Sequence, residues 1–153
     1  MAENKGVAVQ GLPPNKRYIA THSPEGKSVY FESPPQHFNG SPGVGGVARS
    51  YSLASLPATI GDSSDIKSYL AEDGPTSYTG RNIVSELPTG ANLLVIDLAP
   101  GAKSAMHRTV SVDFSICVMG EIEHELDGGE TVRLRPGVSP VYIILPSLAF
   151  SSG

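Results

Sequence analysis

The chain has 153 residues, a length that predicts one domain able to bury its own hydrophobic core. Its 17 glycines and 13 prolines, together with only 17% charged residues, favour a turn-rich all-β protein over a helical one. The formal net charge of −4 argues against nucleic acid or an anionic membrane as a partner.

Two further features bear on where the protein works. No apolar run approaches the roughly 18 residues that a transmembrane helix needs, and residues 1–17 lack the apolar core of a signal peptide. The one cysteine, Cys117, excludes an intramolecular disulfide and fits a reducing compartment. We therefore expect a cytoplasmic protein that does not bind membranes.

The N-terminal region is predicted to begin with a flexible lead-in and to continue with a β-hairpin. Residues 1–16 are rich in glycine and proline and have no periodic pattern. In the following segment, residues 17–91, two β-prone runs at 17–22 and 28–32 flank the turn sequence Ser-Pro-Glu-Gly-Lys. Strand, turn and strand predict a hairpin.

The rest of residues 17–91 is predicted to hold two loops, one strand and one short helix. Residues 33–46 contain three prolines and four glycines, which predicts a loop, and residues 76–90 predict a second, polar one. Residues 47–56 alternate larger with smaller side chains, which predicts an edge strand. The Asp-Ser-Ser-Asp sequence at 62–65 is an N-cap signal. Apolar residues at i, i+3 and i+4 follow it, so a short helix is expected there.

Residues 92–146 are predicted to form the β core. Three β-prone runs are separated by Ala-Pro-Gly at 99–101 and by Gly120, and the third run ends at Asp-Gly-Gly (127–129). Asp-Gly and Gly-Gly between β-rich runs are strong hairpin signals. We therefore expect antiparallel strands over residues 92–137, with hairpin turns near Gly120 and at 127–129.

One spacing within this core goes beyond a strand pattern. The sequence has the spacing Gly101-x5-His107-x-Thr109-x3-Asp113-x6-Gly120, where x is any residue. Positions 107, 109 and 113 share parity. On one continuous strand their side chains would therefore point to the same face.

This spacing resembles the first motif of the cupin superfamily, G-x5-H-x-H-x(3,4)-E-x6-G, and residues 90–137 look most like small single-domain cupins of fungi. Thr109 stands where that motif has its second histidine, and Asp113 where it has glutamate. The resemblance implies an all-β, cupin-like jelly-roll barrel with an N-terminal β arm and one short helix. N-terminal strands in such cupins commonly cross to a second subunit, so it also implies a homodimer.

The resemblance also implies a function. Cupins like this one are small-molecule enzymes of fungal secondary metabolism: oxygenases, decarboxylases, dehydratases or isomerases acting on organic acids or polyketide-like compounds. His107 and Asp113 would then hold a divalent metal (Fe, Mn or Zn), or act as acid and base in a metal-free site. Catalytic metal sites usually have three protein ligands, so this pair is an incomplete set.

The alternative is a non-catalytic or defunct cupin that at most binds a small ligand. Similar cupins continue with a second motif, G-x5-P-x-G-x2-H-x3-N, which supplies a further ligand histidine and the closing strands. Here no histidine follows His124, and residues 141–145 predict a single strand. We therefore expect a chain truncated before the second motif, an incomplete barrel with an open sheet edge, and a tail at 147–153 that adds no strand.

Four side chains continue the parity of His107 and Asp113 and would line the pocket. They are Thr109, Ser115, Cys117 and Met119. These small or soft groups suit an apolar organic ligand. The residues of opposite parity would pack against an opposing layer or a second subunit, and they include Phe114, Ile116 and Val118.

The remaining histidines predict no ligand site. His124 alternates with three glutamates and shares a face with Ile122 and Leu126, which favours a structural role. Neither His22 nor His37 has a spacing that implies a ligand.

Overall fold

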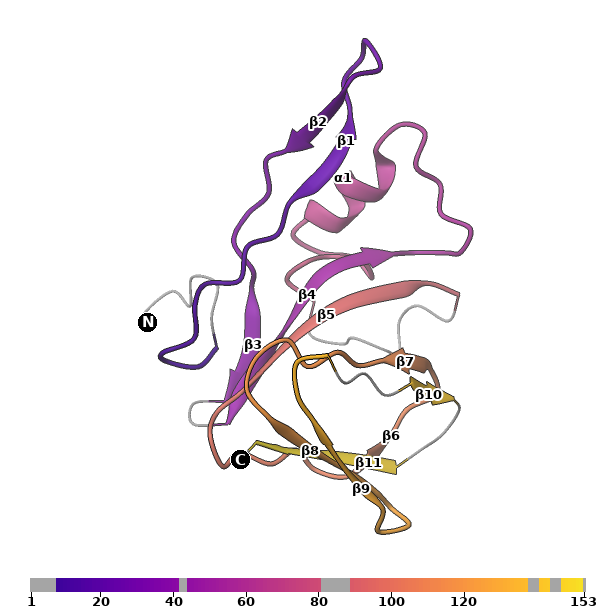
Figure 1. Ribbon diagram of the computed structural model, residues 1–153. Helices are drawn as coiled ribbons and strands as arrows, with labels where there is room; N and C mark the ends of the chain where they lie inside the picture. Colours follow the sequence, from indigo (N-terminus) through magenta and orange to yellow (C-terminus); the bar gives the residue numbers. More distant parts are fainter. Residues whose placement is uncertain (1–7, 42–43, 81–88, 138–140, 144–146, 153) are drawn as a thin grey trace. The chain divides into compact units, whose positions relative to one another are not determined.

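Strands make up most of the regular structure of the computed structural model, and one short helix accompanies them (Figure 1). This confirms the predicted all-β, jelly-roll class. The structure describes residues 8–41, 44–80, 89–137, 141–143 and 147–152. The chain divides into two compact units: the first comprises residues 1–40 and 46–97, and the second comprises residues 41–45 and 98–153.

The N-terminal hairpin is formed as predicted. Its strands are β1 (Ile19–His22) and β2 (Ser28–Phe31), which pair antiparallel from Ile19 opposite Phe31 to His22 opposite Ser28. The Ser23 N–H donates to the Lys27 carbonyl at 2.8 Å and closes the turn. Gly26 has φ +77° in this turn, a conformation that favours glycine.

A three-stranded sheet with the order β3-β4-β5 forms the rest of the β structure of the first unit. Its strands are β3 (Phe38–Ser41), β4 (Gly45–Leu53) and β5 (Ala91–Leu98). The apolar run at 93–98 therefore forms the expected strand. Two predictions were wrong, because the predicted loop at 33–46 contains β3, and the predicted edge strand is the central strand β4.

The burial of β4 explains why its position was mispredicted. Residues of both parities are buried along it, as a central strand requires, yet several of them are polar. Arg49 is only 1% exposed, and Ser50 and Ser52 are also buried. In the sequence such residues resemble the solvated side of an edge strand.

The predicted helix is present as α1 (Ser64–Leu70). Its start differs in detail from a standard N-cap, because Ser63 has φ +58° and its side chain makes no cap hydrogen bond. Instead, Asp62 Oδ1 accepts the Ser64 N–H at 3.0 Å. Ile66 and Tyr69 are the buried residues of the helix. Across the described ranges, no helix has both the length and the apolar character needed to cross a membrane.

Tyr69 of α1 lies at the centre of the core of the first unit. It is fully buried beside Ile19 and Ile66, and its ring centroid is 4.8 Å from that of Tyr51. Its hydroxyl donates to the Arg49 carbonyl at 2.7 Å and accepts a hydrogen bond from Arg17. Burial raises the pKa of the Tyr69 phenol, although Arg17 opposes the shift, so the hydroxyl stays protonated at neutral pH.

Two guanidinium groups fix the loops around this core. Arg17 donates to the Pro34 carbonyl at 2.7 Å, and its Cζ lies 5.0 Å from the centroid of the Tyr69 ring. Arg49 donates to the carbonyls of Pro75 at 2.8 Å and Ser77 at 2.9 Å. Each arginine therefore ties a proline-containing loop to the sheet and helix.

We predict that Tyr69→Phe lowers the free energy of unfolding by about 1–3 kcal/mol, because the Arg49 carbonyl and an Arg17 donor lose their shared partner in a buried environment. Urea denaturation followed by circular dichroism measures the loss. Tyr30→Phe is the matched control, since Tyr30 is 76% exposed, and it should change stability little. Equal effects of the two substitutions would contradict a structural role for the Tyr69 hydroxyl.

In the described part of the second unit, six strands form two sheets. They are β6 (His107–Arg108), β7 (Val112–Phe114), β8 (Ile122–Leu126), β9 (Thr131–Leu134), β10 (Val141–Ile143) and β11 (Ser147–Ser152). One sheet has the order β6-β11-β8-β9, and the other pairs β10 with β7. Among the strands that the structure describes, these sheets do not close into one continuous barrel.

One of the two predicted hairpin turns in the core is confirmed. β8 and β9 pair from Ile122 opposite Leu134 to Glu125 opposite Thr131, so residues 127–130 form the turn. The turn predicted near Gly120 is wrong as a hairpin, because β7 pairs with β10 and β8 pairs with β11. Pairing between strands distant in sequence has replaced the local alternative.

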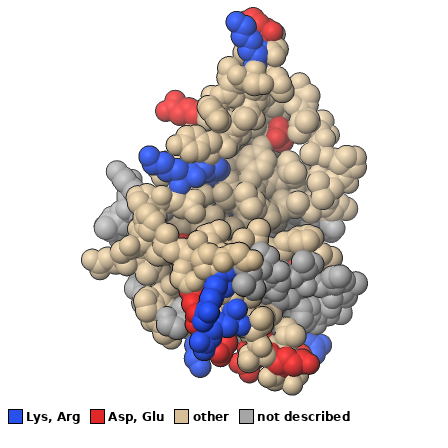
Figure 2. Space-filling model, in the orientation of Figure 1, with Lys and Arg blue, Asp and Glu red and all other residues tan. Residues whose placement is uncertain are grey.

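The outer face of the β8–β9 hairpin carries charges of both signs, which Figure 2 shows gathered in the lower part of the view. Arg133 Nη1 lies 3.1 Å from Glu121 Oε1, and Arg135 Nε also donates to Glu121. The two arginines are largely exposed and Glu121 is partly exposed, so each pair contributes at most about 1 kcal/mol. The three glutamates expected on a solvated face are accounted for by this surface.

The tail is the largest correction to the fold. Residues 147–152 were expected to add no strand, but they form β11, which lies between β6 and β8. β11 pairs with five residues of β8, from Leu148 opposite Leu126 to Ser152 opposite Ile122. The sequence predicted an open sheet edge, whereas in the structure the tail itself pairs along β8.

We predict that Leu148→Pro destabilises the protein by about 1–3 kcal/mol, because position 148 pairs with both neighbouring strands and proline removes its backbone donor. Leu148→Val is the matched control, since valine keeps the N–H and favours strands. Urea denaturation and size-exclusion chromatography measure stability and self-association. A proline variant as stable and monodisperse as the valine variant would contradict the central position of β11.

Candidate functional site

The segment with the candidate site residues is not one strand. β6 ends at Arg108 and β7 begins at Val112, with an irregular stretch at residues 109–111 between them. The two strands also belong to different sheets. The even spacing of His107 and Asp113 therefore does not by itself put their side chains on one face, and the single-strand premise was wrong.

His107 is held in a defined tautomer at the surface of the second unit. Its ring Nδ1 lies 2.9 Å from the Ala105 carbonyl oxygen. A carbonyl can only accept, so Nδ1 is the donor in this contact, and in the neutral ring Nε2 is then the nitrogen with the free lone pair. The side chain is exposed. This arrangement leaves Nε2 available to accept a proton or to bind a ligand.

Asp113 lies within a stretch, residues 109–118, along which exposed and less exposed residues alternate. Its Oδ2 accepts a hydrogen bond from Ser111 Oγ at 3.1 Å, and its backbone pairs with Tyr142 of β10. The odd-numbered residues here are partly or fully buried, and we refer to them together as the inner face. The inner face consists of Thr109, Ser111, Asp113, Ser115 and Cys117.

The even-numbered residues of the same stretch are large, apolar and exposed, and we refer to them as the outer stripe. The outer stripe consists of Val110, Val112, Phe114, Ile116 and Val118. Exposure reaches 81% at Val110 and 78% at Val118. Polar groups thus face inward and apolar groups outward, the reverse of an ordinary surface strand. Met119, expected in the pocket, is also exposed, at 54%.

Thr109 carries an unusual polar atom. Its Oγ1 is buried and has no hydrogen-bond partner among the residues that the structure describes. A buried hydroxyl without a partner costs about 1–3 kcal/mol. Such an atom marks a position where a bound molecule could supply the missing hydrogen bond, and it lies at the motif position expected to carry a second histidine.

The predicted metal site lacks a third ligand in this part of the chain. Over the described ranges, no three side chains of histidine, cysteine, aspartate or glutamate lie close enough together to hold one ion. Thr109 offers only a neutral hydroxyl, a weak ligand for Fe, Mn or Zn. These residues therefore do not fit a three-ligand metal centre, and shared metal binding by His107 and Asp113 stays a prediction.

His124 is the buried histidine of the second unit. It lies on β8 opposite Val132 of β9 and is 2% exposed. Burial lowers its pKa below the ordinary value of 6.5, so it is neutral at pH 7. This supports the structural role that its alternation with glutamates predicted.

We predict that stability falls as the pH drops below about 6.5, because His124 then gains a proton more readily in the unfolded chain than in the folded one. The loss continues until the pH passes the lowered pKa of the folded state. His124→Gln cannot bind this proton and should lose less stability between pH 7.5 and pH 5. Urea denaturation at both pH values, with the exposed His22→Gln as control, tests this. A loss as large in His124→Gln as in the control would contradict it.

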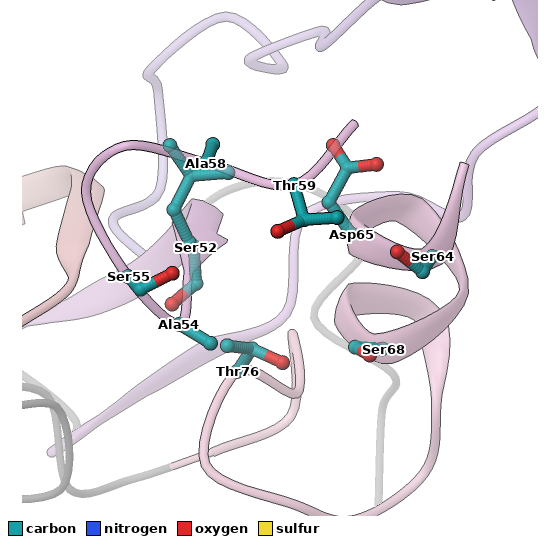
Figure 3. Close-up of a pocket in the computed structure, with 10 residues that line it drawn as sticks. Ser52, Ala54, Ser55, Ala58, Thr59, Ser64, Asp65, Ser68 and Thr76 are labelled. Atoms are coloured by element: carbon teal, nitrogen blue, oxygen red, sulfur yellow. The ribbon is translucent and has the colours of Figure 1, made fainter. Parts of the chain in front are cut away.

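A cavity of about 140 Å³ lies in the first unit, where the sequence predicted no site. It opens between the end of β4, the following loop, α1 and Thr76 (Figure 3). Six of its ten lining residues carry a hydroxyl group, Leu53, Ala54 and Ala58 are apolar, and Asp65 is the one carboxylate among them. The sequence identified Asp65 only as part of a helix start, and no local pattern could have joined these separate segments.

Comparisons with known proteins relate the chain to proteins of several fungi, although no family model matches it. It is 31% identical over 140 residues to Phomopsin biosynthesis cluster protein C' of Diaporthe leptostromiformis, covering 90% of this chain and 70% of that protein. It is 29% identical over 128 residues to Oryzines biosynthesis cluster protein J of Aspergillus oryzae, covering 82% and 68%. It is 31% identical over 129 residues to Cupin-domain-containing oxidoreductase srdB of Neurospora crassa, covering 83% and 61%.

Proposed function

This chain belongs to a family of fungal cupins, and we propose that it acts on a small organic molecule in secondary metabolism as an oxidoreductase. The observation that carries the proposal is the 31% identity over 140 residues with a protein of the phomopsin biosynthesis cluster. Two relatives named as cupin-domain-containing oxidoreductases, each aligned over 83% of the chain, support the reaction class.

His107 is the proposed general base. Its Nδ1–H donates to the Ala105 carbonyl at 2.9 Å, which fixes the ring and leaves Nε2 as the proton acceptor. The exposed ring can be reached by a substrate from solvent. Proton removal from the substrate is one half of a dehydrogenation, whose two electrons must pass to a separate acceptor, and a positioned base typically accelerates the proton removal by about 10²–10⁴-fold.

The inner face is the proposed substrate-binding surface. It offers the unpartnered Thr109 hydroxyl, the hydroxyl of Ser115 and the thiol of Cys117, with Asp113 as its one carboxylate. Such a lining suits a neutral organic molecule with one or two polar groups. An organic acid would need its carboxylate turned away from Asp113, because like charges repel.

A homodimer is proposed to cover the outer stripe. Contiguous exposed apolar side chains mark interaction surfaces more often than free surface, and all five residues of the outer stripe are large and exposed. A second copy presents the same stripe, so a twofold contact would bury both.

A second candidate function is ligand binding without catalysis. The observation that favours it is the absence, in the described ranges, of three side chains able to hold one metal ion. Under this alternative the inner face still binds a small molecule, but His107 transfers no proton.

Deletion of the gene in its host, followed by mass spectrometry of the metabolites, tests the proposed function. We predict that one product disappears and its precursor accumulates, and that the wild-type gene restores the product. Genes that encode His107→Ala or Asp113→Ala should each restore at least tenfold less product than the wild-type gene. A gene that encodes His22→Ala should restore the product fully, because His22 is exposed and distant in sequence from the candidate site.

The possible results separate the alternatives. An unchanged metabolite profile after deletion would refute a role in biosynthesis. Full restoration by both the His107 and the Asp113 variants would refute catalysis by these residues and favour the ligand-binding alternative.

A further inference from the structure

The cavity of the first unit has a built polar lining. It lies against the C-terminal end of β4, with α1 on another side, as Figure 3 shows. Ser52 and Thr76, two of its lining residues, are almost completely buried. Ser52 Oγ donates to Asn92 Oδ1 at 2.8 Å, so this wall is tied to the neighbouring strand β5. The wall is therefore formed by fixed groups of the fold.

The lining combines hydroxyl-bearing residues with a smaller apolar part made by Leu53, Ala54 and Ala58. Six of the ten lining residues carry a hydroxyl group, and they are Ser52, Ser55, Thr59, Ser64, Ser68 and Thr76. Asp65 is the one charged residue among the described lining residues, which include no lysine, arginine or histidine. Hydroxyls can both donate and accept, whereas a carboxylate only accepts. The lining therefore favours a ligand that donates hydrogen bonds and carries positive charge.

The orientation of the Asp65 carboxylate is set by its neighbour Tyr51. The Tyr51 hydroxyl donates to Asp65 Oδ2 at 2.6 Å. Burial raises the pKa of the Tyr51 phenol, and the hydrogen bond with Asp65 raises it further, so the phenol remains a donor at neutral pH. One such bond orients the carboxylate and leaves acceptor capacity for a ligand, since two carboxylate oxygens offer about four acceptor positions.

The field of α1 does not cancel this charge. Asp65 lies in the first turn of the helix, where the backbone contributes at most about half a positive charge. The carboxylate carries a full negative charge, so a net attraction for a cation remains. An anionic ligand would meet Asp65 with no basic partner among the described lining residues.

The size of the cavity limits the ligand. A volume of about 140 Å³ is close to that of an engineered cavity that holds one benzene molecule, and about four to five waters would fill it. Drug-sized ligands need about 300 Å³ or more. The cavity therefore accommodates a molecule of a few heavy atoms, or a single arm of a larger one.

We propose that this cavity binds a small amino alcohol, with its ammonium group against Asp65 and its hydroxyl against the serine and threonine hydroxyls of the lining. The site is distinct from the inner face and uses neither His107 nor Asp113. It therefore goes beyond the proposed oxidoreductase function and stands or falls separately from it.

Titration of the isotope-labelled full chain with ethanolamine, followed by amide chemical shifts, tests the proposal. Ethanolamine is cationic at neutral pH and carries one hydroxyl. We expect saturable shifts at residues 52–59, 64–68 and 76. Ethylene glycol, which lacks the charge, and glycolate, which is an anion, should bind at least tenfold more weakly at the same pH and ionic strength.

Variants test whether ethanolamine binding needs the charge of Asp65 and the space of the cavity. Asp65→Asn should weaken ethanolamine binding at least tenfold, whereas Asp73→Asn, which removes the same charge at an exposed position outside the lining, should leave it unchanged. Ser68→Leu fills the cavity from an exposed helical position, so the chain should still fold but lose binding.

Three results would overturn the proposal: no saturable shifts with ethanolamine, equal binding of ethylene glycol, or equal affinity of the Asp65→Asn and Asp73→Asn variants. If Asp65→Asn fails to fold, undiminished binding by Ser68→Leu overturns it in the same way.

Discussion

The guanidinium groups of Arg17 and Arg49 are the constraint on which the loops of the first unit depend. The apolar core of this unit is small, with Ile19, Ile66 and Tyr69 as its buried members. A buried guanidinium without acceptors costs several kcal/mol, so the carbonyls that receive these two groups must be in place together. Four carbonyls from three segments meet this need, and they belong to Pro34, to Ser50, and to Pro75 and Ser77 of one loop.

This requirement explains other features of the first unit. Loops rich in proline and glycine take fixed positions because their carbonyls complete the arginine sites. Gly80 is needed as glycine, since a Cβ there would lie 2.6 Å from Arg49 Nη1. The hydroxyl of Tyr69 joins both arginines to α1, and the position of α1 in turn shapes one wall of the hydroxyl-lined cavity.

Local sequence patterns predicted the hairpins and the helix, which depend on residues close to one another in the sequence. Turn chemistry identified the β1–β2 and β8–β9 hairpins, and an i, i+3, i+4 pattern identified α1. Pairing between distant segments was not predictable in this way. β11 pairs with β8 about 26 residues earlier in the chain, and nothing in the tail indicates that partner. The central position of β4 was hidden because its buried side chains are polar and satisfied only in the folded protein.

For the candidate site, too, the sequence predicted only the relations between residues of one continuous segment. Along residues 112–118 exposure does alternate, with Asp113, Ser115 and Cys117 on the less exposed side, but the alternation does not extend to Met119, which is exposed. It failed between His107 and Asp113, where the irregular stretch at 109–111 breaks the strand. The cavity beside α1 could not be predicted, since its lining comes from segments that only the fold brings together.

Thiol accessibility tests most directly whether residues 109–117 turn their odd-numbered side chains inward. Cys117 is the one cysteine of the chain and is 5% exposed, whereas its neighbour Val118 is 78% exposed. A maleimide should modify native Cys117 at least a hundredfold more slowly than it modifies the thiol of Val118→Cys in a Cys117→Ser background, and both should react equally in denaturant. Equal rates in the folded proteins would contradict the assignment of the inner face.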